Sequence, residues 1–140
     1  MPVLHIPVAI PGAGKSHLVN VMGAIRLWLT KDESNQDRNG DVFKHFHENI
    51  GLWLRAGHNV YADATNLTGR SDLRKIAEAE NAQTHLILFK NIRQALSRNA
   101  QRERVVPEEV MLHMLEKYER ALMDINHESY DFVTEVSATR

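Results

Sequence analysis

Residues 9–17, AIPGAGKSH, carry the residue types that bind a chain of phosphate groups. Such binding needs inward-pointing backbone amides, small residues, a lysine for the outer phosphates and a hydroxyl for a magnesium ion. Gly14, Lys15 and Ser16 fit the P-loop pattern, although Ala9 replaces its first glycine. A glycine-rich turn that binds no phosphate is the alternative. The candidate nucleotide-binding residues are Gly12, Ala13, Gly14, Lys15, Ser16 and His17.

Asp32 follows the short apolar segment 26–30, which we expect to be a strand. A carboxylate at a strand end can accept the proton of a hydroxyl group that attacks a phosphate. Asp32 is therefore the candidate general base, and its alternative role is to cap a polar loop. Three other acidic residues compete for the role, namely Glu33, Asp37 and Asp41.

The segment DATN, residues 63–66, follows another apolar segment and is the candidate metal and substrate region. Asp63 is expected to hold the water shell of a magnesium ion. Thr65 and Asn66 are expected either to bind substrate or to form a local turn, because both residue types do so.

Basic residues gather after the apolar segment 84–90. Arg98 and Arg102 are four residues apart, so a helix places them on one face, where two guanidinium groups can grip a phosphate. We expect residues 91–107 to form a lid over the phosphates. A solvated charged face is the alternative, and it is the expected role of Arg93 and Arg104.

These candidate residues need a scaffold of alternating strands and helices. Apolar segments predict strands at 3–10, 26–30, 58–66, 84–90 and 130–136. Apolar residues at helical spacing predict five helices between them. The helices are marked by Leu18, Val21, Met22 and Ile25, by Phe43, Phe46, Ile50 and Trp53, by 70–81, by 91–106, and by Met111, Leu115, Tyr118 and Leu122 after Pro107. We expect Trp28, Phe43 and Trp53 to be core residues.

This alternation predicts an α/β fold with a mostly parallel five-stranded sheet and helices on both of its faces. Ligands bind at the carboxyl ends of the strands in such sheets, and every candidate residue above follows a strand or lies in the lid. The expected architecture is therefore a P-loop NTPase fold with a helical lid.

Composition restricts the remaining possibilities. The chain has 140 residues, a formal net charge of -1 and no cysteine, so we expect one domain over residues 1–140 and neither a disulfide scaffold nor a cysteine zinc site. The balanced charge gives no global attraction to nucleic acid. No segment is typical of a signal peptide or membrane span, and we expect a cytoplasmic protein without a membrane partner.

With these residues in view, the chain resembles the kinase domain of phage-type polynucleotide 5′-hydroxyl kinases. The similar segments are IPGAGKS, TKDE, DATNL and, above all, RNAQR followed by VVPEEVMLHMLEKYERAL. The resemblance implies ATP and Mg²⁺ as cofactors and nucleic-acid 5′-hydroxyl ends as substrate. It implies that Lys15 and Ser16 bind the ATP phosphates and magnesium, that Asp32 is the general base, and that Arg102 with Arg98 contacts the donor phosphates.

Acceptor binding is where this chain departs from the family. The family commonly has an arginine three residues after the base, and this chain has Asn35 there, so Arg38 is the candidate to replace it. Arg70 completes the candidate substrate-binding residues. A small-molecule or nucleoside P-loop kinase, including the toxin and antibiotic-modifying kinds, is the alternative enzyme. A nucleotide-dependent switch that hydrolyses ATP poorly is an alternative of another class.

Overall fold

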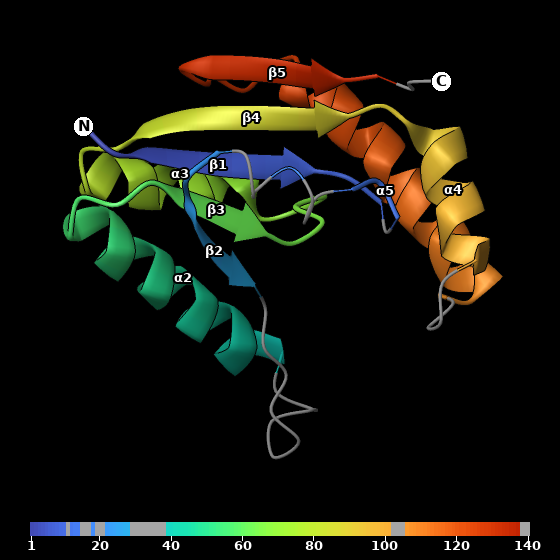
Figure 1. Cartoon of the computed structure of the whole chain (residues 1–140), viewed down its shortest axis with the longest axis horizontal. Helices are drawn as coiled ribbons and strands as arrows, with labels where there is room; N and C mark the ends of the chain where they lie inside the picture. Colours follow the sequence, from blue (N-terminus) through green and yellow to red (C-terminus); the bar gives the residue numbers. More distant parts are fainter. Residues whose placement is uncertain (11, 15–17, 19–21, 29–38, 102–105, 138–140) are drawn as a thin grey trace.

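The computed structural model describes residues 1–10, 12–14, 18, 22–28, 39–101 and 106–137, with the side chains of residues 39–41 excepted. Strands and helices alternate along the chain (Figure 1). Their bounds are β1 Val3–Val8, β2 Ile25–Trp28, α2 Asn39–Arg55, β3 Val60–Asp63, α3 Arg70–Ala79, β4 Gln83–Phe89, α4 Ile92–Gln101, α5 Glu108–Ile125 and β5 Phe132–Val136.

The five strands form one sheet in the order β2-β3-β1-β4-β5, and every pair of neighbours is parallel. Parallel neighbours need crossover connections, which the intervening helices supply. β1 is the central strand, so its carboxyl end lies between the carboxyl ends of β3 and β4. The predicted α/β, P-loop type of fold is confirmed.

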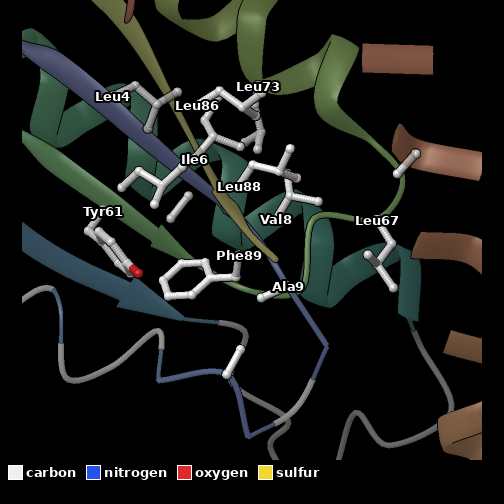
Figure 2. Close-up of a cluster of buried hydrophobic side chains, with 14 of the residues drawn as sticks. Leu4, Ile6, Val8, Ala9, Tyr61, Leu67, Leu73, Leu86, Leu88 and Phe89 are labelled. Atoms are coloured by element: carbon white, nitrogen blue, oxygen red, sulfur yellow. The ribbon is translucent and has the colours of Figure 1, made fainter. Parts of the chain in front are cut away.

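The core lies where the helices pack on the central strands. Leu4, Ile6 and Val8 of β1 are fully buried, as expected for the central strand of a sheet covered by helices. Leu73 of α3 and Leu86 of β4 belong to the same core cluster (Figure 2). All four residues of β3 are buried, so both of its faces are covered. None of the described helices is both long and apolar enough to cross a membrane.

Pro7 lies within β1 although proline lacks the amide hydrogen that a strand donates. The segment after β3 supports β1 at this point. Asn66 donates a side-chain hydrogen bond of 2.8 Å to the carbonyl oxygen of Pro7, and the Ala9 amide donates to the carbonyl oxygen of Thr65 over 3.1 Å. This segment therefore fixes the end of β1 just before the glycine turn.

Three aromatic residues that the sequence pattern assigned to the core are exposed, so that expectation is wrong. Trp28, Phe43 and Trp53 expose 54%, 46% and 39% of their surface. Trp28 ends the edge strand β2, where fewer neighbours can cover a large ring. In α2 the buried stripe follows four-residue steps, and Phe43 and Trp53 lie beside it. The residues of this stripe are Val42, Phe46, Ile50 and Leu54.

Two predicted boundaries also differ. Ile25 was expected on a helix with Leu18 and Met22, but it is the first residue of β2. The charged helix expected over 91–106 is α4, which ends at Gln101, and residues 102–105 lie outside the described part. Helix α5 begins after Pro107, as predicted, because proline suits the start of a helix.

Candidate active site

The glycine turn follows β1 at the carboxyl end of the sheet. Gly12 and Gly14 have φ angles of 91° and 95°, which residues with a side chain rarely adopt. A Cβ at Gly12 would lie 2.4 Å from the carbonyl oxygen of Ala95, so the backbone of α4 packs directly on the turn. The Leu18 amide donates to the carbonyl oxygen of Gly14 over 3.3 Å, as in the first turn of a helix.

Asn91 ties the start of α4 to the same turn. Its side-chain nitrogen donates to the carbonyl oxygen of Ala13 over 3.0 Å, and the residue is only 3% exposed. Its side-chain oxygen Oδ1 is buried and has no hydrogen-bond partner. Close by, the Tyr118 hydroxyl donates to the carbonyl oxygen of Phe89 over 2.7 Å and so joins α5 to the end of β4.

Arg98 extends from α4 over the glycine turn. Its Nη1 lies 3.4 Å from the carbonyl oxygen of Gly12 and 3.2 Å from the position that a Cβ on Gly14 would take. The side chain is exposed. The structure therefore brings together Arg98 and the described part of the predicted phosphate cradle, Gly12, Ala13 and Gly14.

A cavity of about 470 Å³ opens between the glycine turn, the start of α4 and the end of β5. This volume is within the range of small-ligand sites. Apolar residues from three elements face polar ones from α4, an arrangement that suits a flat heterocycle with a charged tail. The lining residues are Ala13, Gly14, Leu18, Phe89, Asn91, Gln94, Arg98, Val136 and Ser137.

Asp63 is the last residue of β3 and is 8% exposed. Its Oδ2 accepts a charged hydrogen bond of 2.6 Å from Nε of Arg26 in β2. Magnesium prefers oxygen ligands, and the indirect, water-mediated role predicted for Asp63 stays a prediction. Arg26, which binds this carboxylate, was not among the predicted site residues.

The side chain of Asn66 works within the chain. Its nitrogen donates to the carbonyl oxygens of Pro7 and Ala62 over 2.8 and 3.0 Å, and its φ is 50°. Asn66 therefore forms a local turn, which is one of its two predicted roles, and this turn positions β1. Direct substrate binding by Thr65 and Asn66 stays a prediction.

Arg70, a candidate substrate-binding residue, is buried and lies in an ion pair with the partly buried Glu128. Its guanidinium donates to both carboxylate oxygens of Glu128 over 2.9 and 3.0 Å and to the carbonyl oxygens of Asn66 and Leu67 over 3.0 and 2.7 Å. Burial alone would raise the pKa of Glu128, but hydrogen bonds from Arg70 and Tyr130 hold that pKa below its usual value. Arg70 thus joins α3 to the segment after α5.

Six predicted site residues lie outside the described part of the chain, and their roles stay predictions. Three belong to the cradle, two to the connection between β2 and α2, and one to the lid after α4. They are Lys15, Ser16, His17, Asp32, Arg38 and Arg102. The described residues contain no group of three or more acidic or histidine side chains that could hold a metal ion by itself.

A sequence model of an AAA domain, AAA_33, matches residues 4–121, which is most of the chain. The chain therefore belongs to this family of AAA domains. None of the curated proteins matches it.

Solved structures show the same fold at low sequence identity. One is a gluconokinase from Sinorhizobium meliloti 1021, with a TM-score of 0.64 and 16% identity over 99% of this chain and 83% of that chain. Another comes from the PezAT chromosomal toxin-antitoxin system of Streptococcus pneumoniae, with a TM-score of 0.57 and 11% identity over 98% of this chain and 68% of that chain. Together with the sheet order and the glycine turn, these findings define a domain with the P-loop type of fold.

Proposed function

We propose that this P-loop domain transfers the γ-phosphoryl group of ATP to the 5′-hydroxyl end of a polynucleotide. The observation that supports the kinase chemistry is the position of Arg98. Its Nη1 lies 3.4 Å from the carbonyl oxygen of Gly12, and its side chain lines a cavity of nucleotide size. The segments RNAQR and VVPEEVMLHMLEKYERAL support the polynucleotide acceptor through their resemblance to polynucleotide kinases.

The donor side of the reaction uses the glycine turn and α4. The cavity takes the base and sugar, and the amides of the glycine turn with Lys15 hold the phosphates. Arg98, with Arg102, binds the phosphoryl group while its charge spreads during transfer, which is the main contribution a protein makes to this reaction. Ser16, and Asp63 through water, would hold a magnesium ion, which would neutralise phosphate charge.

The acceptor side uses the end of β2. Asp32 accepts the proton of the acceptor hydroxyl as its oxygen attacks the γ-phosphorus. The bond between the γ-phosphorus and the bridging oxygen breaks, and ADP leaves with that oxygen. The products are the phosphorylated acceptor, ADP and one proton.

A small hydroxyl compound is the second candidate acceptor. The fold similarity to a gluconokinase favours including a sugar acid among the acceptors. The near-neutral charge of the chain also agrees with a small acceptor.

The experiment that separates these acceptors is a transfer assay with γ-labelled ATP. The acceptors are DNA and RNA oligonucleotides with a 5′-hydroxyl end, matched 5′-phosphorylated oligonucleotides, nucleosides and gluconate. The proposal expects label on the 5′-hydroxyl oligonucleotides alone. Label on gluconate or nucleosides alone would replace the polynucleotide acceptor, and ADP formation that no acceptor stimulates would indicate a nucleotide-dependent switch.

Two variants check the assigned chemistry in the same assay. Asp32→Asn should abolish transfer and leave ATP binding nearly unchanged, because the amide cannot accept the proton. Arg98→Ala should lower kcat by about a hundredfold, which is typical for loss of one charge-stabilising donor. Leu96→Ala is the matched control, since Leu96 is an exposed neighbour on α4. An unchanged rate in Arg98→Ala would remove α4 from the mechanism.

A further inference from the structure

An exposed indole stands at the carboxyl end of the edge strand β2. Trp28 is the last residue of this strand and exposes 54% of its surface. The guanidinium carbon of Arg26 lies 5.0 Å from the centre of the indole ring, which is a cation–π contact. Residues 26 and 28 are two apart on a strand, so both side chains project from the same face.

Asp63 fixes this pair from the neighbouring strand. Trp28 pairs with Asp63 in the register of β2 and β3, and Arg26 donates to the Asp63 carboxylate over 2.6 Å. The carboxylate thus holds the guanidinium, and the guanidinium lies over the indole. A ring held in this way loses less conformational entropy when a ligand stacks on it than a freely rotating ring would.

Packing in the core does not explain why a tryptophan occupies position 28. More than half of it is in contact with water, and its neighbour Arg26 keeps 42% of its side chain exposed. Its place in the fold is informative, because ligands of parallel sheets bind at the carboxyl ends of strands. Trp28 also precedes the candidate general base Asp32 by four residues.

We propose that Trp28 is a stacking platform for the base of the acceptor's 5′-terminal nucleotide, and that Asp63 and Arg26 position it. This inference rests on the proposed polynucleotide kinase function and names the acceptor group that the site recognises. Every nucleobase has a π-face, so stacking on an aromatic side chain binds single strands with little sequence preference.

A sugar acid would leave this platform unused, because it has no aromatic ring. The platform therefore distinguishes the two acceptor classes by chemistry. It also predicts that binding depends on the presence of a 5′-terminal base and depends little on which base it is. Trp53 offers an internal comparison: it is also exposed, but it belongs to the last turns of α2 and packs edge-on against His58 with ring centres 5.2 Å apart.

The test uses the fact that the chain has two tryptophans. In the full-length variant Trp53→Phe, Trp28 is the sole fluorescent indole. Titration with a 5′-hydroxyl oligonucleotide should quench its emission in a saturable manner. An oligonucleotide of the same length with an abasic first nucleotide should quench weakly and bind roughly tenfold less tightly, because it keeps the phosphates and loses the stacking base.

Kinetics of two further variants complete the test. Trp28→Ala should raise the KM for the oligonucleotide roughly tenfold and leave the KM for ATP unchanged, whereas Trp28→Phe should keep both values close to those of the wild type. Trp53→Ala is the control and should change neither. Thermal unfolding of each variant shows whether the fold is kept, which the exposure of Trp28 leads us to expect.

Equal binding of the normal and abasic oligonucleotides, or an unchanged oligonucleotide KM in Trp28→Ala, would overturn the platform. The kinase proposal would survive that result if the wild type still phosphorylates 5′-hydroxyl ends. Conversely, a wild type that phosphorylates gluconate and no oligonucleotide would overturn both proposals together.

Discussion

Asn91 and Ala13 are 78 residues apart in the sequence, yet the side-chain nitrogen of Asn91 donates a 3.0 Å hydrogen bond to the carbonyl oxygen of Ala13. The bond joins the first residues of the lid region to the glycine turn. Because Asn91 is buried, water cannot replace it as a donor. The geometry of the phosphate cradle therefore depends on the packing of α4.

Removing this bond should damage both stability and nucleotide binding. Asn91→Ala leaves the Ala13 carbonyl without its donor, and we expect the free energy of unfolding to fall by about 1–3 kcal/mol. The KM for ATP should rise as well, because the turn loses its tie to α4. Chemical denaturation and steady-state kinetics measure the two effects. Ser97→Ala, an exposed change on the same helix, is the control, and equal behaviour of both variants would contradict the role of Asn91.

Gly12 should tolerate no side chain. Gly12→Ala combines a positive φ with a Cβ 2.4 Å from the Ala95 carbonyl oxygen, so α4 must move away from the turn. We expect loss of ATP binding and a clearly lower melting temperature. Gly57→Ala is the matched control, because Gly57 has a φ of 90° and nothing within 4 Å of its Cβ position, which leaves backbone strain of about 1–2 kcal/mol alone. Calorimetric ATP titration and thermal melts of the two variants make the comparison.

The ion pair of Arg70 and Glu128 should act on stability. Arg70→Met removes the buried cation of a partly buried pair and its donors to two carbonyl oxygens, and should lower the free energy of unfolding by about 1–3 kcal/mol. Arg55→Met breaks the exposed pair with Glu80 and should change stability little. Denaturant unfolding measures both.

Kinetics of Arg70→Met then test the untested substrate role of Arg70. An unchanged KM for the acceptor at a temperature where the variant is folded would assign Arg70 to the scaffold. A KM that rises while stability is unaffected would assign it to substrate binding instead.

The histidine pair in the centre of the sheet should make stability depend on pH. Nδ1 of His5 and Nδ1 of His85 lie 2.7 Å apart, and burial together with the charge of His85 lowers the pKa of His5 to about 4. Unfolded histidine has a pKa near 6.5, so the unfolded chain binds more protons between these values. Stability contributed by His5 is therefore complete above about pH 6.5 and falls as the pH drops toward 4.

Thermal unfolding between pH 4.5 and 7.5 measures this dependence. His5→Phe should show a shallower loss of melting temperature at low pH than the wild type. His58→Phe is the comparison outside the pair, and its pH dependence should follow that of the wild type. The same slope in all three proteins would contradict the role of His5.

The order of elements could be predicted from the sequence because it depends on local signals. The apolar segment 3–10 marks a buried strand, and Pro107 marks the start of α5. The exposure of Trp28 and Trp53 could not be predicted in this way. The apolar character of a residue shows only that its ring can be buried. Whether the ring is buried depends on the position of its strand in the sheet or on the orientation of its helix.

The site could be predicted only where one segment carries it. The glycine turn is a local motif, and Nη1 of Arg98 lies 3.4 Å from the carbonyl oxygen of Gly12, while the lid role of Arg98 stays a prediction. The contacts of Arg26 with Asp63 and of Arg70 with Glu128 join residues 37 and 58 apart. No local spacing reveals such pairs, because they depend on which strands and helices become neighbours.

A crystal structure of the protein with ADP and Mg²⁺ tests the central claim most directly. We expect the adenine ring in the cavity beside Phe89 and Val136, with the phosphates against Gly14 and within reach of Arg98. ADP bound elsewhere, or phosphates that point away from the glycine turn and α4, would contradict it.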